Sequence, residues 1–265
     1  MALTLATWNI NSVRLRIDLV RRLLNEEQPD VLCLQETKTP DEFFPREAFT
    51  ELGYTHQLIH GMKGYNGVAI ISKLPLHGPS TKSWCAREDC RHALAELPGG
   101  IELHNLYIPA GGDIPDPRVN PKFAHKLQFL DELLRWFAAD SPKRRKAILV
   151  GDLNIAPLET DVWSHKELLK VVSHTPIEVE KLTAIQAAGG FVDAVRHFIP
   201  PEKQLYTWWS YRAQDRKKSD RGRRLDHVWV TPALVPRLRG AKVKKLARDW
   251  TQGSDHVPVI VEFGD

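Results

Sequence analysis

The sequence alternates short apolar segments with longer segments of helical spacing, and this order constrains the fold more than any other feature. Segments of strand length are 3–8, 31–34, 68–72, 93–97, 101–108, 147–151, 225–230 and 257–263. Apolar residues recur every three to four positions in 12–27, 123–137 and around 182–188, as expected for helices with one buried face. Strands that alternate with helices indicate an α/β protein.

The connections between these segments say how the strands pair. Many are short, which favours antiparallel pairing, and the last strands are not followed by helices. We therefore expect mixed sheets rather than a purely parallel one. A chain of 265 residues can bury a large core, and no Gly/Ser-rich linker divides it. We expect one domain, residues 1–265, of layered sheets and helices.

Composition excludes several classes of protein. No apolar run approaches the 18 residues needed to cross a bilayer, and the N-terminus lacks the basic start of a secretion signal. We expect no membrane contact and a cytoplasmic, nucleoid-associated location. The three cysteines, Cys33, Cys85 and Cys90, are an odd number with no zinc-site spacing, so we interpret them as free thiols.

Positive charge is concentrated near the C-terminus. The net charge is +4, but residues 212–248 contain thirteen Lys and Arg residues against three Asp. Aromatic residues lie directly upstream, at 206, 208, 209 and 211. This pattern suits a phosphate backbone, although most charged runs are simply solvated surface loops.

Polar residues cluster where the expected strands end or begin. The six segments are WNIN (8–11), LQETK (34–38), NLYIP (105–109), GDLN (151–154), RLDH (224–227) and GSDH (253–256). Any one of them could be a turn or a helix cap. Carboxylates and amides that converge at strand ends also form active sites in α/β proteins. If two α/β halves faced each other, Glu36 and Asp152 would reach one cleft.

Taken in order, these segments closely resemble the exonuclease III family of DNA repair nucleases, which includes the abasic-site endonucleases. That family belongs to the wider endonuclease/exonuclease/phosphatase superfamily, and the resemblance runs essentially from end to end. The segments that carry it are TWNINS, LQETK, KGYNGVAIIS, NLYIPAGG, GDLNIAP, YTWWSYR, RGRRLDH and GSDHVPV. It implies a four-layered α/β sandwich, with two mixed β-sheets packed face to face and helices outside, as in DNase I.

Phosphodiester hydrolysis needs an attacking water, neutralised charge on the phosphoryl oxygens and help for the leaving oxygen. Oxygen ligands without cysteine suit Mg²⁺, with Mn²⁺ as a substitute. The resemblance implies that Glu36 binds this metal, with Asn9 supporting the metal or its waters and Asp255 as a further acidic neighbour. The alternative for Glu36 is a surface carboxylate beside Lys38.

The resemblance also implies the reacting groups. Asp152 matches the general base, and Asn154 would hold the same water or a phosphoryl oxygen. His256 paired with Asp226 would donate to a phosphoryl oxygen, although an isolated Asp–His pair is more often a cap or a core pair. Tyr107 would donate to the phosphate or lie near the leaving oxygen, and the residues leave these two roles open.

The residues expected to bind DNA are Lys38, Tyr65, Trp208, Trp209, Arg212, Arg216, Arg223 and Leu225. At the positions of Trp208 and Leu225 the family lines a pocket for a flipped-out abasic sugar; the alternative is that these aromatics are core. Two departures concern this pocket. Arg223 stands where the family tends to have an apolar or aromatic residue, and the loop 110–113 lacks polar or basic residues that abasic endonucleases often use. Both leave the balance of activities open.

The expected function is a metal-dependent DNA repair phosphodiesterase. It would cut 5′ to abasic sites and act as a 3′→5′ exonuclease, with 3′-end cleaning. The expected partner is double-stranded DNA with abasic or 3′-damaged ends, and the expected state is a monomer. Alternatives are a phosphatase of inositol phosphates or lipids, an RNA deadenylase, or a DNA-binding module without activity.

Overall fold

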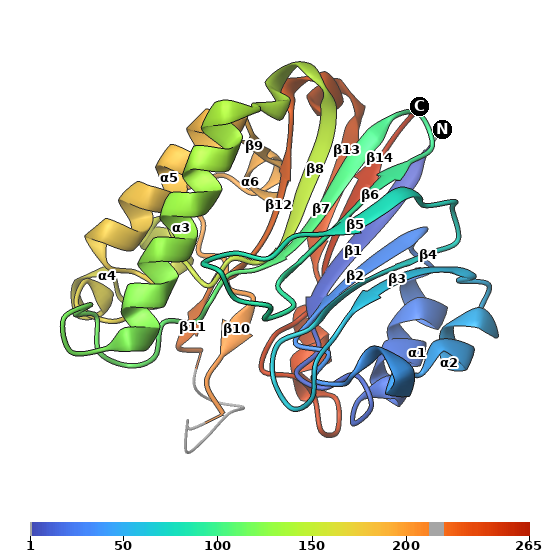
Figure 1. Ribbon diagram of the computed structural model, residues 1–265, viewed down its shortest axis with the longest axis horizontal. Coiled ribbons are helices and arrows are strands. Elements are labelled where there is room, and N and C mark those ends of the chain that lie inside the picture. Colours follow the sequence, from blue (N-terminus) through green and yellow to red (C-terminus); the bar gives the residue numbers. More distant parts are fainter. Residues whose placement is uncertain (1, 212–219) are drawn as a thin grey trace.

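Two six-stranded sheets pack face to face in the computed structural model, which describes residues 2–211 and 220–265 (Figure 1). The first has the order β13 (Leu238–Val243), β14 (Val259–Phe263), β1 (Leu3–Asn9), β2 (Val31–Gln35), β4 (Val68–Ser72) and β3 (His56–His60). The second has the order β5 (His77–Thr81), β6 (His92–Leu97), β7 (Ile101–Tyr107), β8 (Lys146–Asp152), β12 (Asp226–Val230) and β9 (Val192–Asp193). A small ladder joins β10 (Trp208–Trp209) to β11 (Gly222–Arg223).

Each large sheet contains one parallel pair, β1 with β2 and β7 with β8, and its other pairs are antiparallel. The helices are α1 (Ile17–Glu27), α2 (Arg46–Thr50), α3 (Pro121–Ala139), α4 (His165–Leu168), α5 (Pro176–Gly189) and α6 (Ala194–Phe198). Short 3₁₀ turns are Asp41–Phe43, Pro142–Arg144, Glu159–Asp161, Pro232–Arg237 and Lys245–Asp249. In Figure 1, α1 and α2 lie outside the first sheet, and α3 and α5 lie outside the second. The expected four-layered sandwich of mixed sheets is confirmed.

Side chains that alternate between the two faces of each strand fill three apolar layers, one between the sheets and one between each sheet and its helices. In β2, Val31 and Cys33 belong to the core between the sheets, whereas Leu32 and Leu34 pack toward α1 and α2. Successive side chains of a strand point to opposite faces, so a strand buried on both faces is apolar throughout. All three cysteines are buried and unpaired, as expected for free thiols.

A polar bridge crosses the interior between the sheets close to the strand ends. The Nε2 of Gln35, on β2, donates to Oδ1 of Asn105, on β7, at 2.7 Å. The Nδ2 of Asn105 donates back to the carbonyls of Leu34, at 3.0 Å, and Ala69, at 2.9 Å. Both side chains are fully buried, so these hydrogen bonds replace those that water would otherwise supply.

The helix α1 begins later than the sequence indicates. It starts at Ile17 rather than at Ser12, because Asn11 and Ser12 both have positive φ and the chain turns before the helix begins. The strands β3, β5 and β13 were missed because they lack apolar runs; β5 is an edge strand exposed along its whole length. Among the described residues, no helix combines the length and hydropathy that a membrane span needs.

Part of the basic segment is internal, which corrects the interpretation of its charge. The guanidinium of Arg224 is buried between two carboxylates: its Nε and Nη2 bond to Asp161, at 2.8 and 2.9 Å, and its Nη1 to Asp193, at 2.5 Å. Lys242 and Lys244 both pair with Glu27. Arg224 and Lys244 are thus largely buried against carboxylates of the protein itself, and a count of charges along the chain overstates what can face DNA.

We expect Arg224→Leu to destabilise the protein by about 3–5 kcal/mol, because it leaves two buried carboxylates without their main cation. Urea unfolding followed by circular dichroism measures this change. Arg118→Leu is the control, since Arg118 pairs with Asp116 on the exposed surface, where solvent screens an ion pair and it contributes little to stability. Equal effects of the two substitutions would contradict the assignment.

Candidate active site

The two parallel strand pairs end at one place, and their last residues meet there. Asn9 ends β1, Tyr107 ends β7, Asp152 ends β8, and Glu36 directly follows β2. The Nδ2 of Asn9 lies 2.9 Å from Oε1 of Glu36 and 2.9 Å from Oδ2 of Asp152. One amide therefore joins an acid from each sheet. Glu36 and Asn154 line one cleft, whereas Asp152 is fully buried and meets Glu36 through Asn9.

The backbone at these strand ends is unusual. Asn11, Glu36, Lys38 and Asn154 all have φ between 48° and 53°, a region that residues other than glycine rarely adopt. Such conformations cost free energy and cluster at functional sites. Gly151 has φ 135°, and a Cβ there would lie 1.9 Å from the carbonyl oxygen of Leu106. Only glycine therefore fits directly before Asp152.

The carboxylate of Glu36 accepts from several donors. Tyr107 donates its hydroxyl to Oε1 at 2.8 Å, and Lys38 Nζ lies 2.7 Å from Oε2. Burial opposes ionisation of Glu36, but the charge of Lys38 and the hydrogen bond from Asn9 prevail and lower its pKa. Burial, with Glu36 next, raises the pKa of Tyr107, so its phenol stays protonated as a donor.

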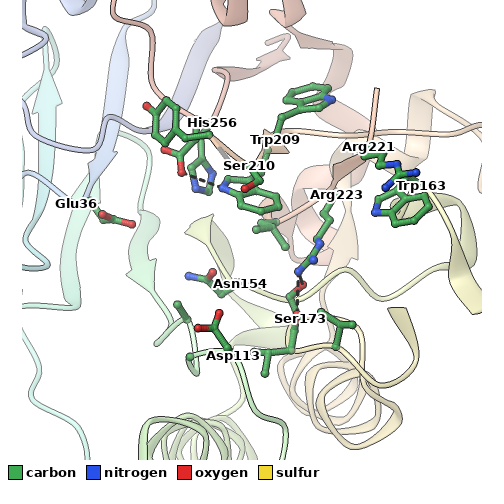
Figure 2. A pocket seen from close by; sticks show the side chains of 18 of the residues that line it. Glu36, Asp113, Asn154, Trp163, Ser173, Trp209, Ser210, Arg221, Arg223 and His256 are labelled. Carbon is green, nitrogen blue, oxygen red and sulfur yellow. Dashed lines mark hydrogen bonds between the residues drawn. The ribbon is translucent and has the colours of Figure 1, made fainter. Parts of the chain in front are cut away.

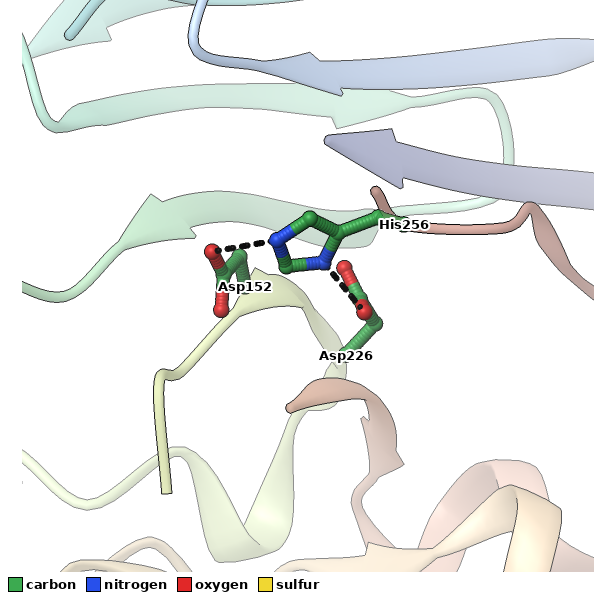
Figure 3. Close-up of side chains that lie close together, drawn as sticks. All are labelled: Asp152, Asp226 and His256. Carbon is green, nitrogen blue, oxygen red and sulfur yellow. Dashed lines mark hydrogen bonds and ion pairs between the residues drawn. The ribbon is translucent and has the colours of Figure 1, made fainter. Parts of the chain in front are cut away.

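Asp152 and His256 form the second half of the site (Figure 3). The Nδ1 of His256 lies 2.8 Å from Oδ2 of Asp226, and its Nε2 lies 3.6 Å from Oδ2 of Asp152. Burial lowers the pKa of His256, but Asp226 and Asp152 outweigh it and raise the pKa to about 10. Burial raises the pKa of Asp152 to about 7, against the opposing charge of His256.

Asn154 holds Asp152 in place. Its backbone N–H donates to Oδ1 of Asp152 at 2.9 Å, and its Nδ2 donates to Oδ2 at 3.0 Å and to the carbonyl of Ile108 at 2.9 Å. Asp152 thus accepts hydrogen bonds on both oxygens and faces a cationic imidazole. This environment orients a carboxylate and tunes its basicity.

The donor set fits a divalent cation. Four carboxylates, those of Glu36, Asp152, Asp226 and Asp255, surround the site, against the cations Lys38 and His256. Excess negative charge on oxygen ligands, without thiolate, is what Mg²⁺ prefers. Glu36, at the cleft, is the residue that would hold it. Asn9 turns its Nδ2 to Glu36, and its Oδ1 accepts from the backbone N–H of Asn11 at 3.1 Å, so its support of a metal or of the metal's waters stays a prediction.

A second grouping, Asp152, Asp226 and His256, brings one ligand atom from each residue within 4.8 Å of the others. A metal ligand must be a neutral imidazole with a free lone pair. Asp226 already occupies Nδ1 of His256, at 2.8 Å, and Nε2 faces Asp152 at 3.6 Å, so we interpret this group as a proton-holding relay.

Asp255 faces the cleft but binds other partners. Its Oδ2 accepts from Nε1 of Trp208 at 3.0 Å, and its Oδ1 accepts from Nδ2 of Asn11 at 3.2 Å. Asp255 therefore anchors an indole at the cleft wall, and its role beside a metal stays a prediction. Asn11 also accepts from Lys38 Nζ, at 2.6 Å; the WNIN segment contained this residue without indicating that role.

The cleft has a volume of about 800 Å³ and continues from Glu36 and His256 to the expected DNA-binding residues (Figure 2). Trp208, Arg223 and Leu225 all line it. Trp209 also lines the cleft, although it is only 2% exposed and packs into the core. Tyr65 is 72% exposed and lies by a separate hollow that Tyr107 also lines. Arg212 and Arg216 lie outside the described residues.

One buried ion pair beneath the cleft had no signal in the sequence. Lys126 Nζ lies 2.5 Å from Oε1 of Glu178 and donates to the carbonyl of Asn154 at 2.8 Å. Glu178 accepts from the backbone N–H of Ser173 and Thr175. The pair connects the Asn154 turn to the loop before α5, and its members lie too far apart along the chain to give a periodic pattern.

Two mixed sheets with an acid, amide and histidine set at the ends of their parallel strands define a phosphodiester hydrolase. Comparison with known sequences agrees: the chain belongs to the endonuclease/exonuclease/phosphatase family, which matches residues 6–256. This family is divalent-metal dependent.

Curated relatives align over nearly the whole chain. Exodeoxyribonuclease III of Haemophilus influenzae is 29% identical over 97% of this chain and 98% of its own length. Recombination repair protein 1 of Drosophila melanogaster is 31% identical over 98% of this chain, which spans only 37% of that longer protein.

Solved structures give the same result. An AP endonuclease from Archaeoglobus fulgidus superposes with a TM-score of 0.90 at 34% identity, over 98% of this chain and 99% of its own. A variant of the 3′ phosphatase NExo from Neisseria, bound to a product DNA hairpin, gives a TM-score of 0.90 at 29% identity, over 99% of this chain and 100% of its own.

Proposed function

We propose that the protein is a DNA repair nuclease that cuts duplex DNA 5′ to abasic sites and removes nucleotides and blocking groups from 3′ ends. The observation that most supports this proposal is the amide of Asn9, which joins Glu36 to Asp152 beside His256. Relatives named as an exodeoxyribonuclease III, an AP endonuclease and a 3′ phosphatase support this assignment. We further propose that the chain acts as one domain and a monomer, in the cytoplasm.

In this proposal each side chain has one task. Asp152 accepts a proton from the attacking water, and Asn154 fixes the orientation of that carboxylate. His256, held by Asp226, donates to a phosphoryl oxygen, and Tyr107 offers its hydroxyl to the phosphate or the leaving oxygen. Mg²⁺, or Mn²⁺ in its place, would supply charge neutralisation when bound at Glu36 and Asn9.

The test is cleavage by the purified protein with Mg²⁺ of three duplexes: one with a single abasic analogue, one with a recessed 3′ end and one with a 3′-phosphate. We expect cleavage 5′ to the analogue and products with a 3′ hydroxyl. Inositol phosphates and polyadenylated RNA test the alternative substrates in parallel. Turnover of either of these, with all three duplexes left intact, would overturn the proposal.

The pH dependence tests the pairing of Asp152 with His256. Asp152 can accept a proton only when it is ionised, so activity is lost as pH falls through its pKa. The cationic His256 lowers that pKa, so His256→Gln should raise it and move the acid limb of the kcat/KM profile to higher pH. Profiles from about pH 5.5 to 9 at saturating Mg²⁺ measure the shift, with the exposed His77→Gln as control. An acid limb that stays in place or moves to lower pH would contradict the pairing.

A further inference from the structure

Arg223 is a cation in the wall of the cleft without a carboxylate partner among the described residues. It lines the same cleft as Glu36, Asn154 and His256. The next residue, Arg224, points to the opposite side and is neutralised by two buried carboxylates. Of these two neighbouring arginines, Arg224 has carboxylate partners in the interior, whereas Arg223 has none among the described residues and lies where substrate would bind.

The contacts of Arg223 fix its position without neutralising it. Its Nη1 donates to the carbonyl of Val172 at 2.9 Å and to Oγ of Ser173 at 2.8 Å (Figure 2). Its Cζ lies 5.1 Å from the centre of the Trp208 ring, which Asp255 anchors in turn. Its buried Nε has no hydrogen-bond partner in the part of the chain that the structure describes.

A guanidinium held in this way is costly in free energy. Burial lowers the pKa of Arg223, although the group stays charged at neutral pH. Glu178 is the carboxylate whose charge favours its ionised form, and Glu178 is already paired with Lys126 at 2.5 Å. An incoming oxyanion would supply the negative charge and the hydrogen-bond acceptors that Arg223 does not receive from the protein.

We propose that Arg223 forms an oxyanion subsite, which binds a negatively charged group on the part of the substrate that keeps the phosphate after cleavage. This proposal rests on the proposed function. In the reaction a water oxygen bonds to phosphorus, the bond from phosphorus to O3′ breaks, and O3′ takes a proton. The phosphate stays on the other fragment, whose sugar or sugar remnant extends into the pocket beside Trp208.

Two sources of this oxyanion share the same chemistry. At an internal abasic nucleotide it is the next backbone phosphate, on the 3′ side of the sugar. At a damaged 3′ end it is the carboxylate of an oxidised sugar remnant, such as a glycolate ester of the terminal phosphate. An apolar residue at position 223 would not distinguish this phosphate or carboxylate from an uncharged group of the same shape. Arg223 would therefore determine the preference for substrates that carry the oxyanion.

The experiment compares substrates that differ by one charge. One pair of duplexes carries a 3′-phosphoglycolate or its isosteric, uncharged 3′-phosphoglycolamide. The other pair carries a single abasic analogue followed by a normal phosphate or by an uncharged methylphosphonate. The kcat/KM values are measured for the unmodified protein, Arg223→Leu and Arg223→Lys. The control is Arg22→Leu, because Arg22 also stacks on a tryptophan, Trp250, at 4.3 Å, but lies on α1.

We expect the unmodified protein to prefer the charged member of at least one pair by roughly ten- to a hundredfold, as a charge-assisted hydrogen bond gives. Arg223→Leu should bring that ratio close to one, Arg223→Lys should keep part of it, and the control should keep all of it. The pair that responds identifies the source of the oxyanion.

Equal cleavage of charged and uncharged substrates by the unmodified protein would overturn the subsite, whether or not the variants fold. A preference that survives in Arg223→Leu would overturn the role of this residue. In both cases the protein still cuts DNA. Failure of the proposed function looks different, because the unmodified protein would then cleave none of the four duplexes.

Discussion

Asp152→Asn is expected to lower kcat by roughly 10³- to 10⁴-fold and to leave the affinity for DNA nearly unchanged. Asparagine has the same size but cannot accept the proton of the attacking water. It also removes the charge that faces His256 and receives the amides of Asn9 and Asn154. Single-turnover rates on the abasic duplex measure the first effect, and binding of the uncut duplex in EDTA measures the second.

The chain offers a matched control for this substitution. Asp113 is an exposed carboxylate that lines the same cleft, so Asp113→Asn changes the net charge there equally. We expect it to change kcat by less than about threefold, since Asp113 is not placed among the reacting groups. If Asp152→Asn kept a rate close to that of Asp113→Asn, the general base would have to be another group.

Removal of the metal is expected to have an effect of similar size. EDTA should abolish cleavage, and Mg²⁺ should restore it in full, because the phosphoryl charge would otherwise lie among four carboxylates. Glu36→Gln should raise the Mg²⁺ concentration for half-maximal activity by about ten- to a hundredfold, because it removes the proposed metal-binding carboxylate. Asn9, Lys38 and Tyr107 all form hydrogen bonds or an ion pair with that carboxylate. Initial rates over a Mg²⁺ titration, repeated with Mn²⁺, measure the change.

Glu42→Gln is the control, because Glu42 is an exposed acid outside the cleft. An unchanged Mg²⁺ requirement in Glu36→Gln would place the ion elsewhere. Activity that persists in EDTA would contradict a metal-dependent mechanism for this chain.

The sequence predicts the strands and the polar ends of the strands well, but not the way those ends meet. Apolar runs locate β1, β2, β7 and β8 within a residue or two, because these strands are buried on both faces. The contact of Asn9 with Asp152, 143 residues away, depends on how two sheets pack. No local spacing encodes that packing; the pattern of strand ends suggested only that two facing α/β halves would bring Glu36 and Asp152 together.

The tryptophan pair shows a second limit of sequence reasoning. Trp208 and Trp209 are both expected to contact DNA, yet neighbours on a strand point to opposite sides. Both line the cleft, but Trp208 is partly exposed beside Arg223, whereas Trp209 is almost fully buried and donates its Nε1 to Asp220. Composition and clustering cannot separate two adjacent residues, and only the register of β10 does so.

The polar bridge from Gln35 to Asn105 has a consequence for how this protein can fail. Neither sheet holds a complete site: Glu36 follows a strand of one sheet and Asp152 ends a strand of the other, and the bridge fixes their mutual offset directly beside Glu36. A small slippage of one sheet over the other would misalign the acids while every strand stayed intact. Lost turnover would then be the earliest sign of damage deep in the interior, ahead of any sign of unfolding.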